Sequence, residues 1–118
     1  MPRILIVEDE PDIALGLSDD LTLEGHHVEV VGDGETAVRR GREPGWELIV
    51  LDVMLPRKDG FDVCRDLRRS GILTPIILLT TESQDAKKQE GKAAGATGWI
   101  VKPFTPEQLI AVVKKVAA

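Results

Sequence analysis

Cysteine is almost missing from this 118-residue sequence, which contains a single one. One cysteine excludes an internal disulfide framework and any zinc or iron–sulfur site built from several cysteines. An excess of positive charge is also missing, because 15 lysines and arginines face 20 aspartates and glutamates, for a net charge of −5. This balance argues against non-specific electrostatic binding to nucleic acid or anionic lipid. No hydrophobic run reaches the length of a signal-peptide core or a membrane span. We therefore expect a cytoplasmic protein.

Short apolar runs alternate with helical patterns along the whole sequence. The runs lie at residues 3–7, 27–31, 47–51, 75–79 and 98–101. The helical patterns lie at residues 11–25, 35–42, 61–70, 84–94 and 105–116. Strict alternation predicts an α/β fold, a doubly wound parallel sheet with helices on both faces. At this length the flavodoxin-like (βα)5 arrangement with strand order 2-1-3-4-5 fits best. We expect a single domain over residues 1–118, with the more polar run 27–31 nearer an edge.

Local signals mark where two of the helices begin. Pro11 suits a first helical turn, with Asp9 or Glu10 as the cap. Thr105 followed by Gln108 predicts a capping box at the start of the last helix. The stretch 84–94 has no large apolar residue, so its helix would be anchored only by alanines, and we expect it to be the most mobile one. Those alanines are Ala86, Ala93 and Ala94.

Polar residues follow four of the five apolar runs. Glu8 and Asp9 follow the first run, Asp52 the third, Thr80 the fourth, and Lys102 the fifth. In a parallel sheet of order 2-1-3-4-5, the carboxyl ends of these strands share one rim, where ligands bind. Three acids against one lysine would recruit a hard divalent cation with oxygen ligands, and Mg²⁺ fits this description.

The chemistry that we infer is attack by Asp52 on phosphorus, giving an aspartyl phosphate. Thr80 and Lys102 would hold the transferred oxygens. Each residue alone has a structural reading: Asp9 as a helix cap, Asp52 as a turn residue, and Lys102 as a surface lysine. The joint arrangement favours a site, because four strand ends would otherwise present polar groups to one rim by coincidence.

These residues lie in segments that resemble the receiver domain of bacterial two-component response regulators. The resemblance covers essentially the whole chain, and its ordered set of acidic pair, Asp, Thr and Lys-Pro is specific. The matching segments are ILIVEDEPD (4–12), DLTLEGH (20–26), LIVLDVMLPRKDGFDV (48–63), PIILLT (75–80) and IVKPF (100–104).

The resemblance implies a phosphoacceptor and a magnesium site. Asp52 corresponds to the phosphoacceptor. Asp9 corresponds to a direct Mg²⁺ ligand, with Glu8 acting partly through water. The backbone carbonyl of Met54, two residues after Asp52, corresponds to a third protein ligand.

The resemblance also implies a switch. Thr80 corresponds to the hydroxyl that moves to the phosphoryl group, and Lys102 to the lysine that binds it. The bond between Lys102 and Pro103 corresponds to one that is usually cis. Trp99 occupies the switch-aromatic position, where the family usually has Tyr, Phe or His.

A phosphorylatable signalling switch follows as the leading function. A sensor histidine kinase or a small donor such as acetyl phosphate would supply the phosphoryl group. The chain would catalyse no reaction on other molecules and would only hydrolyse its own acyl phosphate slowly. The fourth helix, fifth strand and fifth helix would form the output surface for a partner protein. We expect no nucleic-acid or membrane binding, and a monomer or a phosphorylation-dependent dimer.

Alternative functions remain open from the sequence alone. Residues 1–79 resemble receivers of winged-helix regulators and residues 80–118 resemble chemotaxis-type receivers, so a chimera or engineered scaffold with a seam near 79–81 is one alternative. A phosphohydrolase would need a second acid shortly after the nucleophile, which Val53, Met54 and Leu55 do not supply. A toprim-like nuclease would need an Asp-x-Asp pair on a later strand, which the sequence also lacks. A flavodoxin-type cofactor binder would need a phosphate loop after the first strand, where this chain has acids.

Overall fold

The computed structural model describes residues 3–81 and 88–117. Its strands are β1 (Arg3–Val7), β2 (His27–Val31), β3 (Leu48–Asp52), β4 (Ile76–Thr81) and β5 (Gly98–Lys102). Its helices are α1 (Pro11–Leu23), α2 (Gly34–Gly41), α3 (Gly60–Arg69), α4 (Lys88–Ala94) and α5 (Pro106–Ala117). All strand pairs are parallel, in the order β2-β1-β3-β4-β5. The expected (βα)5 fold is confirmed, with β2 at an edge.

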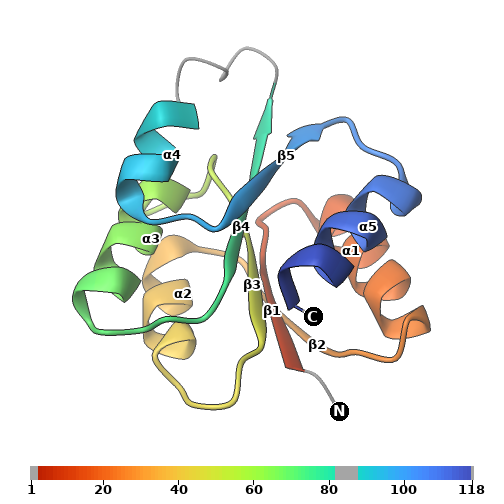
Figure 1. Ribbon diagram of the computed structural model, residues 1–118, viewed down its shortest axis with the longest axis horizontal. Helices are drawn as coiled ribbons and strands as arrows, with labels where there is room; N and C mark the ends of the chain where they lie inside the picture. Colours follow the sequence, from red (N-terminus) through yellow and green to blue (C-terminus); the bar gives the residue numbers. More distant parts are fainter. Residues whose placement is uncertain (1–2, 82–87, 118) are drawn as a thin grey trace.

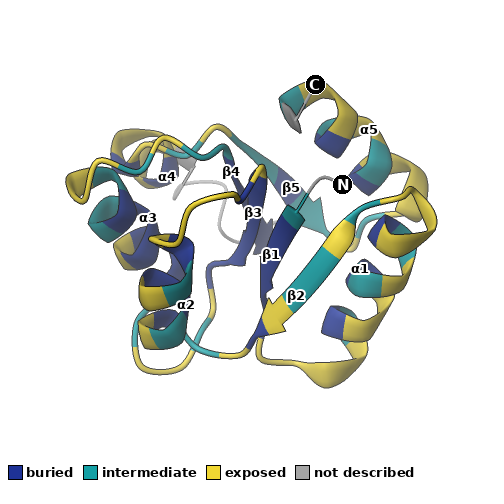
Figure 2. Ribbon diagram, turned by 90° about the horizontal axis from the view of Figure 1, so that it is seen from below, coloured by how far each residue is buried: buried dark blue, intermediate teal, exposed yellow. Residues whose placement is uncertain are grey.

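The sheet separates two hydrophobic layers. In Figure 1, α1 and α5 cover one face of the sheet, and α2, α3 and α4 cover the other. Successive strand residues alternate between them: Leu5 and Val7 pack toward α2, α3 and α4, whereas Ile4 and Ile6 pack toward α1 and α5. Figure 2 shows β1 and β3 as largely buried, with β2 more exposed. Among the described helices, none has the length and hydrophobicity that a membrane crossing requires.

Three strands extend further than the apolar runs that predicted them. The third, fourth and fifth strands reach Asp52, Thr81 and Lys102. Backbone pairing causes the extension, because Asp52 is still in register with Leu79, and Thr81 with Lys102. The polar residues expected just after β3 and β5 are therefore their last residues, where the ladder holds their backbone in place.

Helix starts agree with the sequence in α5 and differ in α1. In α5 the Thr105 N–H donates to Gln108 Oε1 at 2.8 Å, and the Gln108 N–H donates to Thr105 Oγ1 at 3.2 Å, which confirms the capping box. In α1, Glu10 occupies the cap position without a side-chain cap bond. Of the two expected cap residues, Asp9 and Glu10, it is therefore Glu10 that takes the position, although its side chain forms no cap bond. Asp9 is left available for another role.

Helix α4 packs through a glycine for which the sequence pattern predicts no packing role. The expected helix began at residue 84, but 82–87, including Ala86, lie outside the described residues. Ala94 is buried as expected, whereas Ala93 is exposed, so that part of the prediction is wrong. Gly91 is buried instead, and a Cβ there would lie only 2.8 Å from Leu78 Cδ1. The absence of a side chain lets α4 approach β4 closely.

Candidate functional site

The carboxyl ends of β1, β3 and β5 bring the predicted charged residues together. Carboxylate oxygens of Glu8, Asp9 and Asp52 lie within 4.8 Å of one another. The Lys102 ammonium lies 3.2 Å from Asp52 Oδ1 and 3.4 Å from Glu8 Oε2. Residues from three separate strand ends thus form a single cluster of three carboxylates, two of which contact one ammonium.

Burial makes this cluster electrostatically unfavourable in the absence of a cation. Glu8 is 3% exposed and Asp52 is 4% exposed, while Asp9 is exposed to solvent. Burial above all, and then the hydrogen bond with Asp52 and the repulsion between the two carboxylates, raise the pKa of Glu8 from 4.5 to about 7. Lys102 opposes the rise without cancelling it. The pair of buried acids therefore favours a proton or a cation between them.

The chemistry of the donor set fits a hard divalent ion. Carboxylate oxygens are ligands that Mg²⁺ prefers, and the exposed side of Asp9 leaves room for the waters that Mg²⁺ keeps. The N–H of Met54 donates to Asp52 Oδ1 at 3.4 Å. This bond keeps the segment after β3 close to the acidic cluster. These residues could bind a metal ion.

Thr80 lies one position beyond the Leu79 that is in register with Asp52. Its side chain is 2% exposed, and its hydroxyl has no hydrogen-bond partner in the described protein. A buried hydroxyl without a partner is costly, so such a group calls for an explanation. The structure thus places a potential donor, without any competing bond, beside the end of β3.

The residues of β5 take the expected positions. The Lys102–Pro103 peptide bond is cis, the isomer that the family resemblance implies. Trp99 is half-buried, lies opposite Leu78 in β4, and packs against the layer formed with α2, α3 and α4. The strand therefore connects the cluster at Lys102 with an aromatic side chain three residues earlier.

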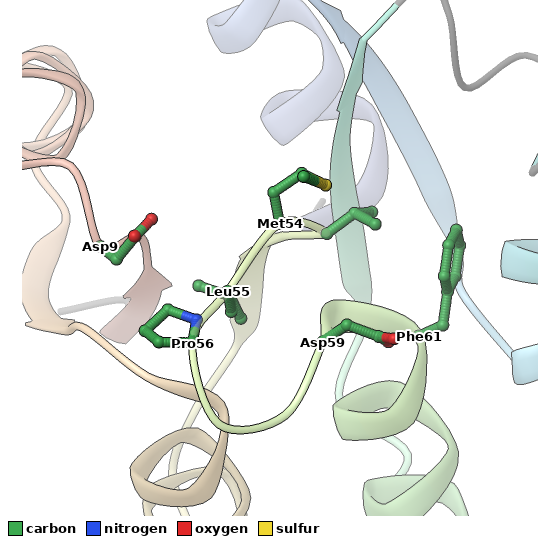
Figure 3. Close-up of a pocket in the computed structure, with 7 residues that line it drawn as sticks. Asp9, Met54, Leu55, Pro56, Asp59 and Phe61 are labelled. Atoms are coloured by element: carbon green, nitrogen blue, oxygen red, sulfur yellow. The ribbon is translucent and has the colours of Figure 1, made fainter.

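A cavity of about 320 Å³ opens beside the acidic cluster. Asp9 reaches it from the connection between β1 and α1, and the other lining residues follow β3 (Figure 3). Asp59 and Phe61 also line this cavity, although neither was predicted as a site residue. Its position before a helical pattern makes Asp59 a helix cap, and its side chain does accept the N–H of Asp62 at 3.0 Å. Phe61 reads as core, and it is 3% exposed. No sequence signal separates these roles from cavity lining.

Comparisons with known proteins agree with this geometry. The family model for the response regulator receiver domain matches residues 4–114. The chain is 43% identical over 109 residues to the transcriptional regulatory protein TcrA of Mycobacterium tuberculosis, covering 92% of this chain but 43% of TcrA. It thus spans less than half of that relative's length.

Solved structures extend the similarity to the fold. The chemotaxis response regulator CheY4 of Vibrio cholerae has a TM-score of 0.92 and 40% identity, with 98% of each chain covered. The receiver domain of a sensor histidine kinase from Pseudomonas aeruginosa, solved with a magnesium ion coordinated in its active site cleft, has a TM-score of 0.89 and 30% identity. That match covers 98% of this chain and 97% of the other.

These matches do not favour a chimera, because a transcriptional regulator and a chemotaxis protein each align with more than nine-tenths of the chain at 40–43% identity. The family match covers residues 4–114, which include the acidic pair, Asp52, Thr80 and Lys102. The chain belongs to the family of response regulator receiver domains.

Proposed function

We propose that this chain is a phosphorylatable signalling switch whose phosphoacceptor is Asp52. The observation that carries the proposal is the Lys102 ammonium 3.2 Å from Asp52 Oδ1, within a cluster of three carboxylates. An isolated buried ion pair would need one acid, and the two additional acids have no structural reason to converge there. A carboxylate beside an ammonium and a cation site is suited to phosphoryl transfer.

The proposed reaction moves one phosphoryl group. A carboxylate oxygen of Asp52 attacks phosphorus, the new O–P bond forms, and the bond from phosphorus to the donor breaks. The donor is a phosphohistidine of a sensor kinase, which leaves as imidazole, or acetyl phosphate, which leaves as acetate. Lys102 offsets negative charge on the phosphoryl oxygens. The chain is proposed to act on itself only, with slow loss of its own acyl phosphate, rather than as an enzyme for external substrates.

Glu8, Asp9, Asp52 and the Met54 carbonyl would hold Mg²⁺. When bound, the ion neutralises negative charge between the carboxylates and the transferred oxygens. Glu8 and Asp52 are buried and preorganised, so little reorganisation is needed at the moment of transfer. Asp9 is exposed, which leaves the cluster open on the side of the cavity.

The proposed switch runs from Thr80 to the surface. The buried Thr80 hydroxyl has no other partner within the described chain and would donate to a phosphoryl oxygen. Its movement would make room for a change at Trp99 and shift a pre-existing equilibrium of the surface formed by α4, β5 and α5. That surface would bind an output protein.

Receiver domains of two-component systems are phosphorylated by histidine kinases. A sensor histidine kinase is therefore the proposed partner upstream, with a cytoplasmic location and a monomer or phosphorylation-dependent dimer. Residues 1–118 are proposed to form one receiver domain that binds neither nucleic acid nor membrane.

Intact-mass measurement after incubation with acetyl phosphate and Mg²⁺ tests the proposal. The wild-type protein should gain the mass of one phosphoryl group, and chelation of Mg²⁺ should prevent the gain. Asp52→Asn should abolish it, whereas Asp19→Asn, a matched change at an exposed residue of α1, should not. Equal labelling of the Asp52→Asn variant would disprove the assigned acceptor, and rapid turnover of external phosphoesters would favour a hydrolase instead.

A further inference from the structure

The loop between β3 and α3, residues 53–59, lies directly against the first residue of α2. Gly34 is buried, and its N–H donates to the Pro56 carbonyl at 3.3 Å. A Cβ on Gly34 would lie 2.0 Å from the carbonyl oxygen of Lys58 and 2.6 Å from the Lys58 Cβ. Real Cβ contacts are essentially never shorter than 3.0 Å, so any side chain would force a separation of at least 1 Å. Glycine at this position sets how closely α2 and the loop approach.

Helix α2 is anchored by its cap and by the core. Its cap, Asp33, accepts the Thr36 N–H at 2.8 Å, and both Ala37 and Val38 are buried in the core. At its other end, a Cβ on Gly41 would be only 2.9 Å from Leu67, so the helix also packs closely against α3. A residue larger than glycine at the start of α2 would therefore displace the loop.

A displacement of the loop would reach the acidic cluster through the backbone. Within the loop the Lys58 N–H donates to Pro56 at 2.8 Å, and the Leu55 N–H donates to Val53 at 3.2 Å. At its end the Gly60 N–H donates to Val53 at 2.9 Å. These short-range bonds make the loop a connected unit that begins at the residue after Asp52.

We propose that Gly34 is a positioning residue for the metal site, because it fixes the loop that presents the Met54 carbonyl to the ion. The inference rests on the proposed function, in which that carbonyl is a ligand. Mg²⁺ demands near-octahedral geometry at about 2.0–2.1 Å, whereas Ca²⁺ accepts variable geometry at about 2.3–2.6 Å. A shift of one ligand by a large fraction of an ångström therefore penalises Mg²⁺ more than Ca²⁺. Gly34 thereby contributes to selectivity between the two ions.

Calorimetric titration of Mg²⁺ and of Ca²⁺ into the Gly34→Ala protein tests this inference. The affinity for Mg²⁺ should fall on the order of tenfold, as for other residues that orient ligands, and the affinity for Ca²⁺ should fall clearly less. Gly32→Ala is the matched control, because a Cβ on Gly32 meets nothing within 4 Å. That control should leave both affinities unchanged. A general loss of stability would lower the affinities for both ions together and leave the ratio of the two affinities unaltered.

The outcomes distinguish the role of Gly34 from the proposed function. Unchanged Mg²⁺ affinity in Gly34→Ala, or an equal loss for both ions, would overturn the role of Gly34 and leave the proposed function standing. Failure of the wild-type protein to bind Mg²⁺ would overturn the proposed function itself. If Gly34→Ala does not fold, amide resonances of the wild-type protein decide: titration with Mg²⁺ should shift Gly34 together with Met54 and leave Gly25 in place. A stationary Gly34 resonance would refute the inference.

Discussion

Replacing Glu8 by glutamine is expected to stabilise the metal-free protein at neutral and alkaline pH. Glu8 is 3% exposed, and burial together with its contact to Asp52 raises its pKa from 4.5 to about 7. Above pH 7 the folded protein must therefore hold two buried carboxylates against a single ammonium. Glutamine has nearly the same shape, carries no charge, and can donate a hydrogen bond to Asp52 as the protonated acid would.

The pH dependence follows from the direction of the shift. Because the pKa of Glu8 is higher in the folded than in the unfolded chain, the folded state binds the extra proton between pH 4.5 and about 7. This contribution to stability is complete below pH 4.5 and is lost as the pH rises through about 7. At about 1.4 kcal/mol per pH unit, the loss amounts to about 3 kcal/mol for the wild-type protein. The Glu8→Gln protein has no such group and should not show it.

Urea unfolding followed by tryptophan fluorescence, with a chelator present, measures the effect. The free energy of unfolding of Glu8→Gln should equal that of the wild-type protein at about pH 4.5 and exceed it by about 3 kcal/mol at about pH 8. Glu47→Gln, the same change at an exposed residue, should have no pH-dependent effect. Added Mg²⁺ should stabilise the wild-type protein more than the variant. A difference between variant and wild type that is the same at both pH values would refute the electrostatic reasoning.

Three further substitutions test local features by urea or thermal unfolding. Thr80→Val, which removes a buried hydroxyl without a protein partner, should raise the free energy of unfolding by about 1 kcal/mol. A lower free energy of unfolding would show that the hydroxyl forms a stabilising hydrogen bond. Arg57→Gly should also stabilise by about 1 kcal/mol, because Arg57 has a φ of 71°; no gain would show an unstrained loop. Gly91→Ala should destabilise by about 1–3 kcal/mol, since its Cβ would lie 2.8 Å from Leu78 and 3.2 Å from Phe61. A higher melting temperature would instead show that helix propensity prevails.

The sequence predicted the strand order and the meeting of the charged residues for one shared reason. Buried strands of a parallel sheet are recognisable as apolar runs, and topology then brings their carboxyl ends to one rim. The position of a residue such as Lys102 could therefore be inferred from its place after a run, without any knowledge of its contacts. The rest of the site, with Asp52 in the last position of β3, followed from the same rule.

Close contacts between backbones could not be predicted in this way. No sequence pattern gives Gly91 a packing role, yet this residue lets α4 pack against β4. Nor does any pattern give a role to Gly34, whose neighbour Lys58 lies 24 residues away in the chain. Which face of a short helix is buried depends on such distant partners, and this is why Ala93 was wrongly placed in the core.

The residues that make the site chemically useful are the ones that cost folding free energy. Glu8 and Asp52 repel each other in a buried position, and Thr80 keeps a buried hydroxyl without a partner in the described protein. Elsewhere β1, β3 and β4 present almost entirely apolar residues to the two layers. The three unfavourable groups lie together at one rim, where a cation and a phosphoryl group would satisfy all of them. Free energy lost on folding at this rim would then be recovered on binding, which would couple the occupancy of the site to the stability of the strands that form it.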